Sequence, residues 1–271
     1  MITGLYVPAD QPRRVAKALA SHADVVLIDL EDALAPAAKP VARARLPELL
    51  DGVSRPVQVR INAMGGPWFE QDAAMVADLP PGVQIRVPKV GRPDQVRDLA
   101  QRLGRGLHIL IESALGVENA GEIAAADPAV QSIGLGEADL RAELGMAEES
   151  GLAWVRSRIV VAAAAANLAP PWMSVYPHLR DPAGLARSCA AGRALGFQGR
   201  AAIHPDQLPV IAQAFRPTEQ ELAQAQQLVD RVAGSIADGS GTVVLDDGSF
   251  ADIAMVRAAR RMLELGNRPL G

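Results

Sequence analysis

The chain has 271 residues, of which 49% are hydrophobic and 21% charged, and its formal net charge is −4. This apolar content excludes a disordered chain, and the length suits one large α/β domain or two smaller ones. The small negative charge gives no general attraction to nucleic acid, and 3% aromatic residues leave no stacking surface for single strands. We therefore expect a globular protein that does not bind nucleic acid.

The sequence shows no sign of a membrane or secretory address. The longest apolar stretch, residues 159–166, is far too short to span a bilayer. Residues 1–14 lack the apolar segment that follows a basic start in a secretory signal. Cys189 is the single cysteine and cannot form an internal disulfide, which is typical of a reducing compartment. We expect a cytoplasmic protein without a membrane partner.

A short β-prone apolar run followed by an Ala- and Leu-rich stretch at helical spacing recurs along the chain. The eight runs are Thr3–Val7, Val25–Leu30, Val57–Ile61, Gln84–Val87, His108–Ile111, Gln131–Leu135, Met173–Tyr176 and Ala201–Ile203. The helical stretches include Gln11–Ser21, Lys39–Leu50, Phe69–Ala77, Pro93–Arg102, Ala120–Ala126, Gly151–Asn167 and Gly184–Leu195. A recurrence of about 20 to 40 residues is typical of successive βα units. Eight units favour a (β/α)8 TIM barrel over a doubly wound sheet.

The segment after the eight units predicts a helix, a hairpin and a second helix. These cover Thr218–Ala237, Gly239–Phe250 and Ala251–Leu265. We expect residues 1–215 to form the α/β barrel domain. Residues 216–271 are expected to be a C-terminal helix–hairpin–helix extension or lid without an independent core.

The carboxyl ends of barrel strands face the ligand, so polar residues there are candidates for chemistry. The residues that follow the strands in chain order are Glu31 and Asp32, Arg60 and Asn62, Lys89, Glu112, Glu137 and Asp139, His178, and His204. Acids dominate after the second, fifth and sixth strands, and bases follow the third and fourth. The predicted barrel mouth therefore brings carboxylates and cations together.

Two of these acids suggest a divalent metal site. Glu112 and Asp139 follow neighbouring strands, so their carboxylates can meet over one point without sharing a loop. Two carboxylates with water and ligand oxygens suit Mg²⁺, which prefers octahedral oxygen ligands. Arg60, across the mouth, can hold a carboxylate or stabilise an oxyanion. Together these three residues indicate metal and oxyanion chemistry.

Other candidate motifs carry less weight. The GLG stretch at residues 134–136 lacks the third glycine of a dinucleotide fingerprint. The four histidines have no metal-ligand spacing, and His204 is best interpreted as structural. Cys189 lies in an Ala-rich helical stretch, which favours a buried, inert thiol.

An ordered series of motifs resembles one known family. The series is YVPADQPRRVAKAL, DVVLIDLEDAL, VRIN, VPKV, LIESALG, GEADL, LGFQGRAAIHPDQ and GSFAD. In this order the chain resembles the HpcH/HpaI aldolase/citrate lyase family, in particular its stand-alone proteins similar to the beta subunit of citrate lyase. The resemblance covers nearly the whole chain.

The resemblance implies a magnesium-dependent enzyme that acts on coenzyme A thioesters. Such enzymes cleave or form a carbon–carbon bond of a 3-hydroxyacyl-CoA, such as citramalyl-, malyl- or citryl-CoA, giving an acyl-CoA and a 2-oxo acid. Two alternatives within enzymes stay open: an aldolase on a free 2-oxo-4-hydroxy acid, and a citrate lyase subunit that needs a carrier-bound thioester. A barrel with a binding role only is a third.

The resemblance also implies roles for individual residues. It places the magnesium ligands on Glu112 and Asp139, and substrate binding on Arg60 and Glu112, with Arg60 catalytic as well. The GSFAD motif places a general acid/base on Asp252, which would reach the site of a neighbouring subunit. By the same resemblance we expect a homo-oligomer, a trimer.

Three further residues are expected to support this chemistry without touching the metal. Glu31 and Asp32 would orient metal-bound water or Lys89. The nucleotide of coenzyme A is expected near basic surface at Arg14, Lys39 or Arg43.

The chain departs from the family pattern in two places. In GEADL the acid next to Asp139 is displaced by one position, and His178 replaces an acid after the seventh strand. The second departure concerns the substrate pocket.

Overall fold

Eight parallel strands form the first part of the chain. The structure, a computed structural model, describes residues 1–237, 243–244, 250–251 and 253–266. The strands are β1 (Thr3–Pro8), β2 (Val25–Asp29), β3 (Val57–Arg60), β4 (Gln84–Val87), β5 (Leu107–Ile111), β6 (Val130–Leu135), β7 (Trp172–Met173) and β8 (Gly199–Ala202). They pair in the order β6-β5-β4-β3-β2-β1-β8-β7, which makes a nearly closed barrel. The predicted (β/α)8 barrel is confirmed.

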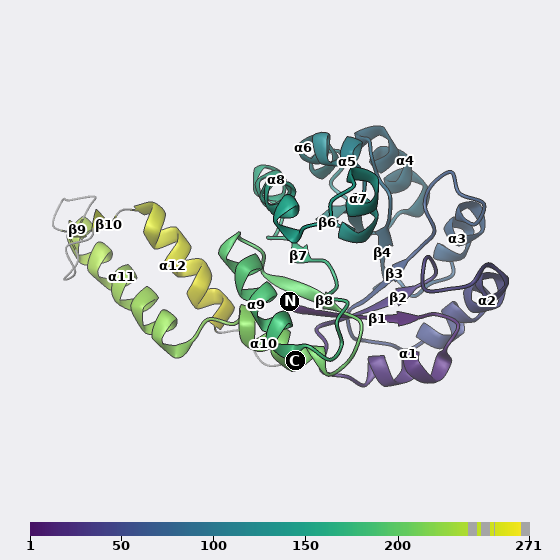
Figure 1. The fold of residues 1–271 in the computed structure, drawn as a ribbon, viewed down its shortest axis with the longest axis horizontal. Coiled ribbons are helices and arrows are strands. Elements are labelled where there is room, and N and C mark those ends of the chain that lie inside the picture. Colours follow the sequence, from purple (N-terminus) through teal and green to yellow (C-terminus); the bar gives the residue numbers. More distant parts are fainter. Residues whose placement is uncertain (238–242, 245–249, 252, 267–271) are drawn as a thin grey trace. The chain divides into compact units, whose positions relative to one another are not determined.

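Helices follow the strands and surround this sheet (Figure 1). They are α1 (Pro12–Leu19), α2 (Lys39–Leu50), α3 (Phe69–Val76), α4 (Pro93–Leu103), α5 (Ala114–Glu118), α6 (Ala120–Ala124), α7 (Glu137–Leu144), α8 (Ala153–Ala165), α9 (Pro182–Ala194) and α10 (Gln207–Phe215). Proline stands in the first turn of α1, α2, α4 and α9, where its missing N–H leaves no helical hydrogen bond unmade. Among the described helices, none is long and apolar enough to cross a membrane.

The two faces of the strands differ in chemistry. Val59, Ile85 and Ile109 belong to the main core, and each is 0% exposed. Burial of each such side chain contributes about 1.5–3 kcal/mol. Because side chains alternate along a strand, the intervening residues face the barrel interior. There Arg86 Nε donates to Gln58 Oε1 at 3.0 Å.

The barrel interior has a polar half and an apolar half. On the polar side His108 Nε2 lies 2.8 Å from Gln84 Oε1, and its Nδ1 lies 2.7 Å from Ser132 Oγ. The apolar side is a cluster of Val25, Leu27 and Ala201, packed against Tyr6 and Trp172. Strands β3 to β6 therefore supply the hydrogen-bonding groups, and β1, β2, β7 and β8 supply the apolar ones.

Strand β7 is shorter than expected from the sequence. It ends at Met173, whereas the apolar run predicted a strand to Tyr176. The next carbonyl, that of Ser174, accepts a hydrogen bond from Arg200 Nε at 2.9 Å. The hydroxyl of Ser174 donates to Leu135 O at 2.5 Å. Side chains thus form hydrogen bonds with backbone carbonyl groups that a longer β7 would use in a strand ladder.

The chain divides into two compact units, Met1–Phe215 and Arg216–Gly271. The second contains α11 (Glu219–Ala237), α12 (Ile253–Gly266) and an antiparallel pair of β9 (Val243–Val244) and β10 (Phe250–Ala251). Thr218 and Glu221 cap α11 reciprocally, since Thr218 Oγ1 accepts from Glu221 N at 3.2 Å and Glu221 Oε2 from Thr218 N at 2.7 Å. Val232 and Val256 are buried in this unit.

Candidate active site

A carboxylate–guanidinium pair lies at the carboxyl ends of β2 and β3. Asp29 and Arg60 are partners in the parallel register of these two strands. Arg60 Nε donates to Asp29 Oδ1 at 2.8 Å, and a second guanidinium nitrogen donates to Asp29 Oδ2 at 2.5 Å. Burial alone would lower the pKa of Arg60, but the pair with Asp29 outweighs it and raises that pKa. Arg60 is therefore a fixed cation with one planar orientation.

A second cation, Lys89, follows β4 and forms an ion pair with Glu31, which Arg60 also contacts. Lys89 Nζ lies 2.7 Å from Glu31 Oε1, and Arg60 lies 2.9 Å from Glu31 Oε2. Asp32 is more distant, at 3.5 Å from Arg60 and 3.6 Å from Lys89. Burial lowers the pKa of Lys89, but the Glu31 carboxylate more than offsets this and raises it to about 12. Both cations therefore keep their charge at neutral pH.

A buried lysine, Lys39, holds the loop that carries Glu31. Lys39 Nζ donates to Leu30 O and Glu31 O, each at 2.7 Å, and to Asn62 Oδ1 at 2.6 Å. Lys39 is only 6% exposed, so the expectation that it belongs to a basic surface is wrong. A helix-starting lysine looks solvent-facing in a sequence, but here three oxygens surround its ammonium.

The two predicted metal ligands lie on β5's carboxyl end and on α7. Glu112 is buried, and a Cβ atom on Gly136 would stand 2.2 Å from Glu112 Oε1. Gly136 immediately precedes α7, whose first turn contains Asp139. Burial, and after it the negative charges of Glu31 and Asp139, raise the pKa of Glu112 to about 7. Two carboxylates close enough to repel each other fit a divalent cation.

Glycine at position 136 thus forms the cradle that lets the Glu112 carboxylate approach the start of α7. Glu112 Oε2 also accepts a hydrogen bond from Lys89 N at 3.1 Å, so one oxygen is oriented by backbone. Lys89 has a positive φ of 57°, a backbone conformation that non-glycine residues adopt rarely. In the described part of the chain no three His, Cys, Asp or Glu side chains are grouped so that they could hold a metal ion.

The structure brings together most of the residues singled out in the sequence. Arg60, Glu31, Asp32 and Lys89 are joined by ion pairs, and Glu112 accepts a hydrogen bond from Lys89 N. Asp139 lies in the first turn of α7, directly after Gly136, whose backbone the Glu112 carboxylate approaches. Asp252 lies outside the described residues. Sequence reasoning missed Asp29, although a charged residue inside a fully buried strand is the signal that could have found it.

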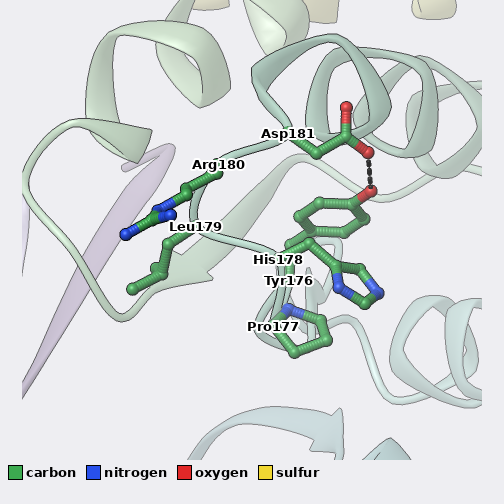
Figure 2. A pocket seen from close by; sticks show the side chains of 6 residues that line it. All are labelled: Tyr176, Pro177, His178, Leu179, Arg180 and Asp181. Carbon is green, nitrogen blue, oxygen red and sulfur yellow. Dashed lines mark hydrogen bonds between the residues drawn. The ribbon is translucent and has the colours of Figure 1, made fainter.

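A pocket opens beside the loop between β7 and α9 (Figure 2). Its volume is about 630 Å³, and it is lined by Tyr176, Pro177, His178, Leu179, Arg180 and Asp181. Tyr176 Oη donates to Asp181 Oδ2 at 2.8 Å, the contact drawn in Figure 2. Asp181 also caps α9 through Gly184 N at 2.8 Å. His178, the departure noted in the sequence, therefore lies in the wall of a pocket.

The remaining candidates have structural surroundings. Cys189 is buried, and burial raises the pKa of its thiol. The His204 ring is 48% exposed and accepts from Asp206 N at 3.2 Å.

A (β/α)8 barrel with acids and fixed cations at the carboxyl ends of its strands is the architecture of a barrel enzyme. The sequence pattern of the HpcH/HpaI aldolase/citrate lyase family matches residues 2–205. The chain belongs to this family, as its motifs indicated.

Individual relatives are similar over almost the whole chain. The citrate lyase subunit beta-like protein of Mycobacterium tuberculosis is 38% identical over 268 residues, which cover 96% of this chain and 93% of that protein. The L-malyl-CoA/beta-methylmalyl-CoA lyase of Rhodobacter capsulatus is 30% identical over an alignment of 291 positions, which covers 94% of this chain and 91% of that protein. The crystal structure of CitE from M. tuberculosis in complex with magnesium, acetoacetate and coenzyme A has a TM-score of 0.84, 34% identity and 98% coverage of both chains.

Proposed function

We propose that this protein is a magnesium-dependent carbon–carbon lyase that cleaves or forms a 3-hydroxyacyl-CoA. The observation that carries the proposal is the Glu112–Asp139 pair of carboxylates at a barrel mouth that also holds Arg60 in a fixed orientation. The relatives support the substrate class, because one is a malyl-CoA/methylmalyl-CoA lyase and a structural neighbour binds magnesium, acetoacetate and coenzyme A.

Glu112 and Asp139 would hold Mg²⁺ through their carboxylate oxygens. When bound, the ion supplies Lewis-acid polarisation of the substrate's hydroxyl and carboxylate oxygens. Glu31 keeps Lys89 in place, and Lys89 N orients one oxygen of Glu112. These contacts fix the Glu112 carboxylate before the substrate arrives.

The role of Arg60 is to stabilise the negative charge that develops during cleavage. A base takes the proton of the 3-hydroxyl, the C2–C3 bond breaks, and its electron pair passes to the thioester as an enolate. The 2-oxo acid leaves, and C2 of the enolate is then protonated to give the acyl-CoA. The guanidinium of Arg60, held by Asp29, is suited to counter the enolate charge, an effect of about 10²–10³ in rate.

Asp252 is our candidate for the proton transfer, worth about 10²–10⁴ in rate. We infer that it acts from a C-terminal lid, residues 216–271, on the site of a neighbouring subunit in a homotrimer. The coenzyme A nucleotide is assigned to the surface near Arg14, which is exposed, because Lys39 is buried and Arg43 is paired with Asp72 at 2.6 Å.

The first experiment is mass spectrometry of the purified protein with Mg²⁺, acetyl-CoA or propionyl-CoA, and glyoxylate, pyruvate or oxaloacetate in turn. A condensation product that requires Mg²⁺ supports the proposal and identifies the oxo acid. The absence of product with every pair contradicts it. The next assays would then be cleavage of a free 2-oxo-4-hydroxy acid and activity with an acyl-carrier protein.

A further inference from the structure

One hydroxyl joins the two ends of the barrel sheet. In the described part of the chain no backbone ladder connects β6 to β7. Ser174 follows β7 directly, and its Oγ donates to Leu135 O, the last carbonyl of β6, at 2.5 Å. The same Oγ accepts from Glu137 N at 3.4 Å. The seam of the barrel is therefore closed by a side chain at the mouth.

The partner of this hydroxyl is the start of α7, which lacks a cap of its own. The first N–H groups of a helix have no partner within the helix and are usually satisfied by a Ser, Thr, Asp or Asn at the N-cap. The N-cap of α7 is Gly136, which has no side chain and makes no side-chain cap hydrogen bond. A Cβ atom there would stand 2.2 Å from Glu112 Oε1, so a larger residue would displace the Glu112 carboxylate. Ser174, the residue after β7, supplies an acceptor for the first N–H of the helix, that of Glu137.

Ser174 is itself fixed from the opposite side. Arg200 on β8 is 2% exposed, and its Nε donates to Ser174 O at 2.9 Å. Another nitrogen of the same guanidinium donates to Ser188 Oγ on α9 at 3.1 Å. The hydroxyl at the seam is thus attached to a buried, anchored backbone and has little freedom to follow a displaced helix.

The first residue of α7, Glu137, is also held through its side chain. Glu137 receives two hydrogen bonds from Arg156 on α8, at 2.7 and 2.8 Å. Asp139 lies two residues further along, in the first turn of α7. Backbone contact with Ser174 and side-chain contact with Arg156 therefore determine where this turn begins.

We propose that Ser174 is a positioning residue for the metal site. Its hydroxyl caps α7 from across the barrel seam and so fixes the Asp139 carboxylate relative to Glu112. This inference rests on the proposed function, which assigns these two acids as the magnesium ligands.

The test is Mn²⁺ binding, measured by electron paramagnetic resonance on the full chain without substrate. Removal of a group that orients a metal ligand typically weakens metal affinity 10–100-fold, and we expect about tenfold for Ser174→Ala. Ser174→Thr keeps the hydroxyl and should bind Mn²⁺ within about twofold of wild type on the same reasoning. Ser157→Ala is the matched control, because Ser157 Oγ donates within its own helix, to Ala153 O.

Three outcomes separate this inference from the proposed function. If wild type binds no Mn²⁺, or if Asp139→Asn binds it unchanged, the metal site and the inference both fail. If Asp139→Asn weakens binding but Ser174→Ala does not, only the positioning role is overturned, even where Ser174→Ala lowers the melting temperature. Should Ser174→Ala not fold, Glu137→Gln, which retains the backbone N–H but weakens the Arg156 pair, must weaken Mn²⁺ binding in its place.

Discussion

Asp29 and Arg60 stand side by side on neighbouring strands and share two hydrogen bonds, of 2.8 and 2.5 Å, at the mouth of the barrel. Asp29 is almost fully buried, and among the described residues Arg60 is the cation that forms an ion pair with it, while Glu31 N donates to its Oδ1 at 2.8 Å. The pair therefore works as a unit. The Asp29 carboxylate sets the plane of the Arg60 guanidinium, and the guanidinium offsets the desolvation cost of the buried carboxylate.

Asp29→Asn should lower kcat/KM with the thioester substrate about 10- to 100-fold, although Asp29 is shielded from solvent. The amide keeps the volume but donates where the guanidinium also donates, so Arg60 loses its fixed plane. Arg60→Lys should lower kcat/KM by about 10²–10³, because an ammonium cannot form the fork. The double variant should lose less than the product of the two, as measured in a double-mutant cycle.

The control for this cycle is an exposed pair of the same chemistry. Glu70 and Arg102 form an ion pair at 2.5 Å with side chains 70% and 35% exposed. Glu70→Gln should leave kcat/KM unchanged, because exposed pairs contribute about 0–1 kcal/mol. Strictly multiplicative losses for Asp29 and Arg60 would contradict the view that they act together.

Gly136→Ala should weaken divalent metal binding while the fold is kept. The new Cβ would stand 2.2 Å from Glu112 Oε1, so the Glu112 carboxylate must move away from the start of α7. We expect at least about a tenfold loss of Mg²⁺ affinity by calorimetry. Gly121→Ala is the matched variant, since a Cβ there meets nothing within 4 Å. Equal affinities for the two variants would argue against Glu112 as a ligand.

Lys39→Met should destabilise the protein by about 1–3 kcal/mol. The apolar replacement leaves Asn62 Oδ1 without its donor, and a buried unsatisfied group costs about that much. Leu30 O keeps a hydrogen bond from Asn62 Nδ2 at 3.1 Å, and Glu31 O keeps one from Leu34 N at 3.2 Å. Urea denaturation monitored by circular dichroism measures the change. Lys17→Met, at an exposed position on α1, provides the comparison and should change stability by less than about 0.5 kcal/mol.

His108 makes the barrel sensitive to acid. Burial, with the charge of Arg86, lowers the pKa of His108 to about 3, below its unfolded value of about 6.5. Its contribution is therefore fully present above pH 6.5. It is lost as the pH falls from 6.5 towards 3, by at most about 1.4 kcal/mol per pH unit.

His108→Gln should flatten the decline in unfolding free energy over this pH range. His22→Gln, at an exposed site, should leave the decline as it is in wild type. Denaturation curves at pH 4, 5, 6 and 7 distinguish the two variants. An unchanged pH dependence in His108→Gln would show that His108 does not cause the acid sensitivity.

The sequence predicts the barrel well because its outward-facing strand residues are apolar and recur at a regular interval. It predicts the mouth less completely, because partners across strands depend on register. Asp29 was hidden inside an apolar run, and only its alignment with Arg60 gives it a role. Glu137 and Asp139 were placed at a strand end, whereas they begin α7 after Gly136. Burial of Lys39 depends on three oxygens that no spacing rule brings together.

All described residues of the proposed metal and oxyanion site lie between positions 29 and 139. The pocket beside the β7–α9 loop lies further along the chain, at residues 176–181. The proposed metal and oxyanion residues and the residues that line this pocket therefore belong to separate stretches of the chain. We expect that exchanging residues 176–181 between relatives changes which oxo acid is accepted, and that the metal requirement stays as it was. That outcome would mean that altering one short loop is enough to acquire a new substrate.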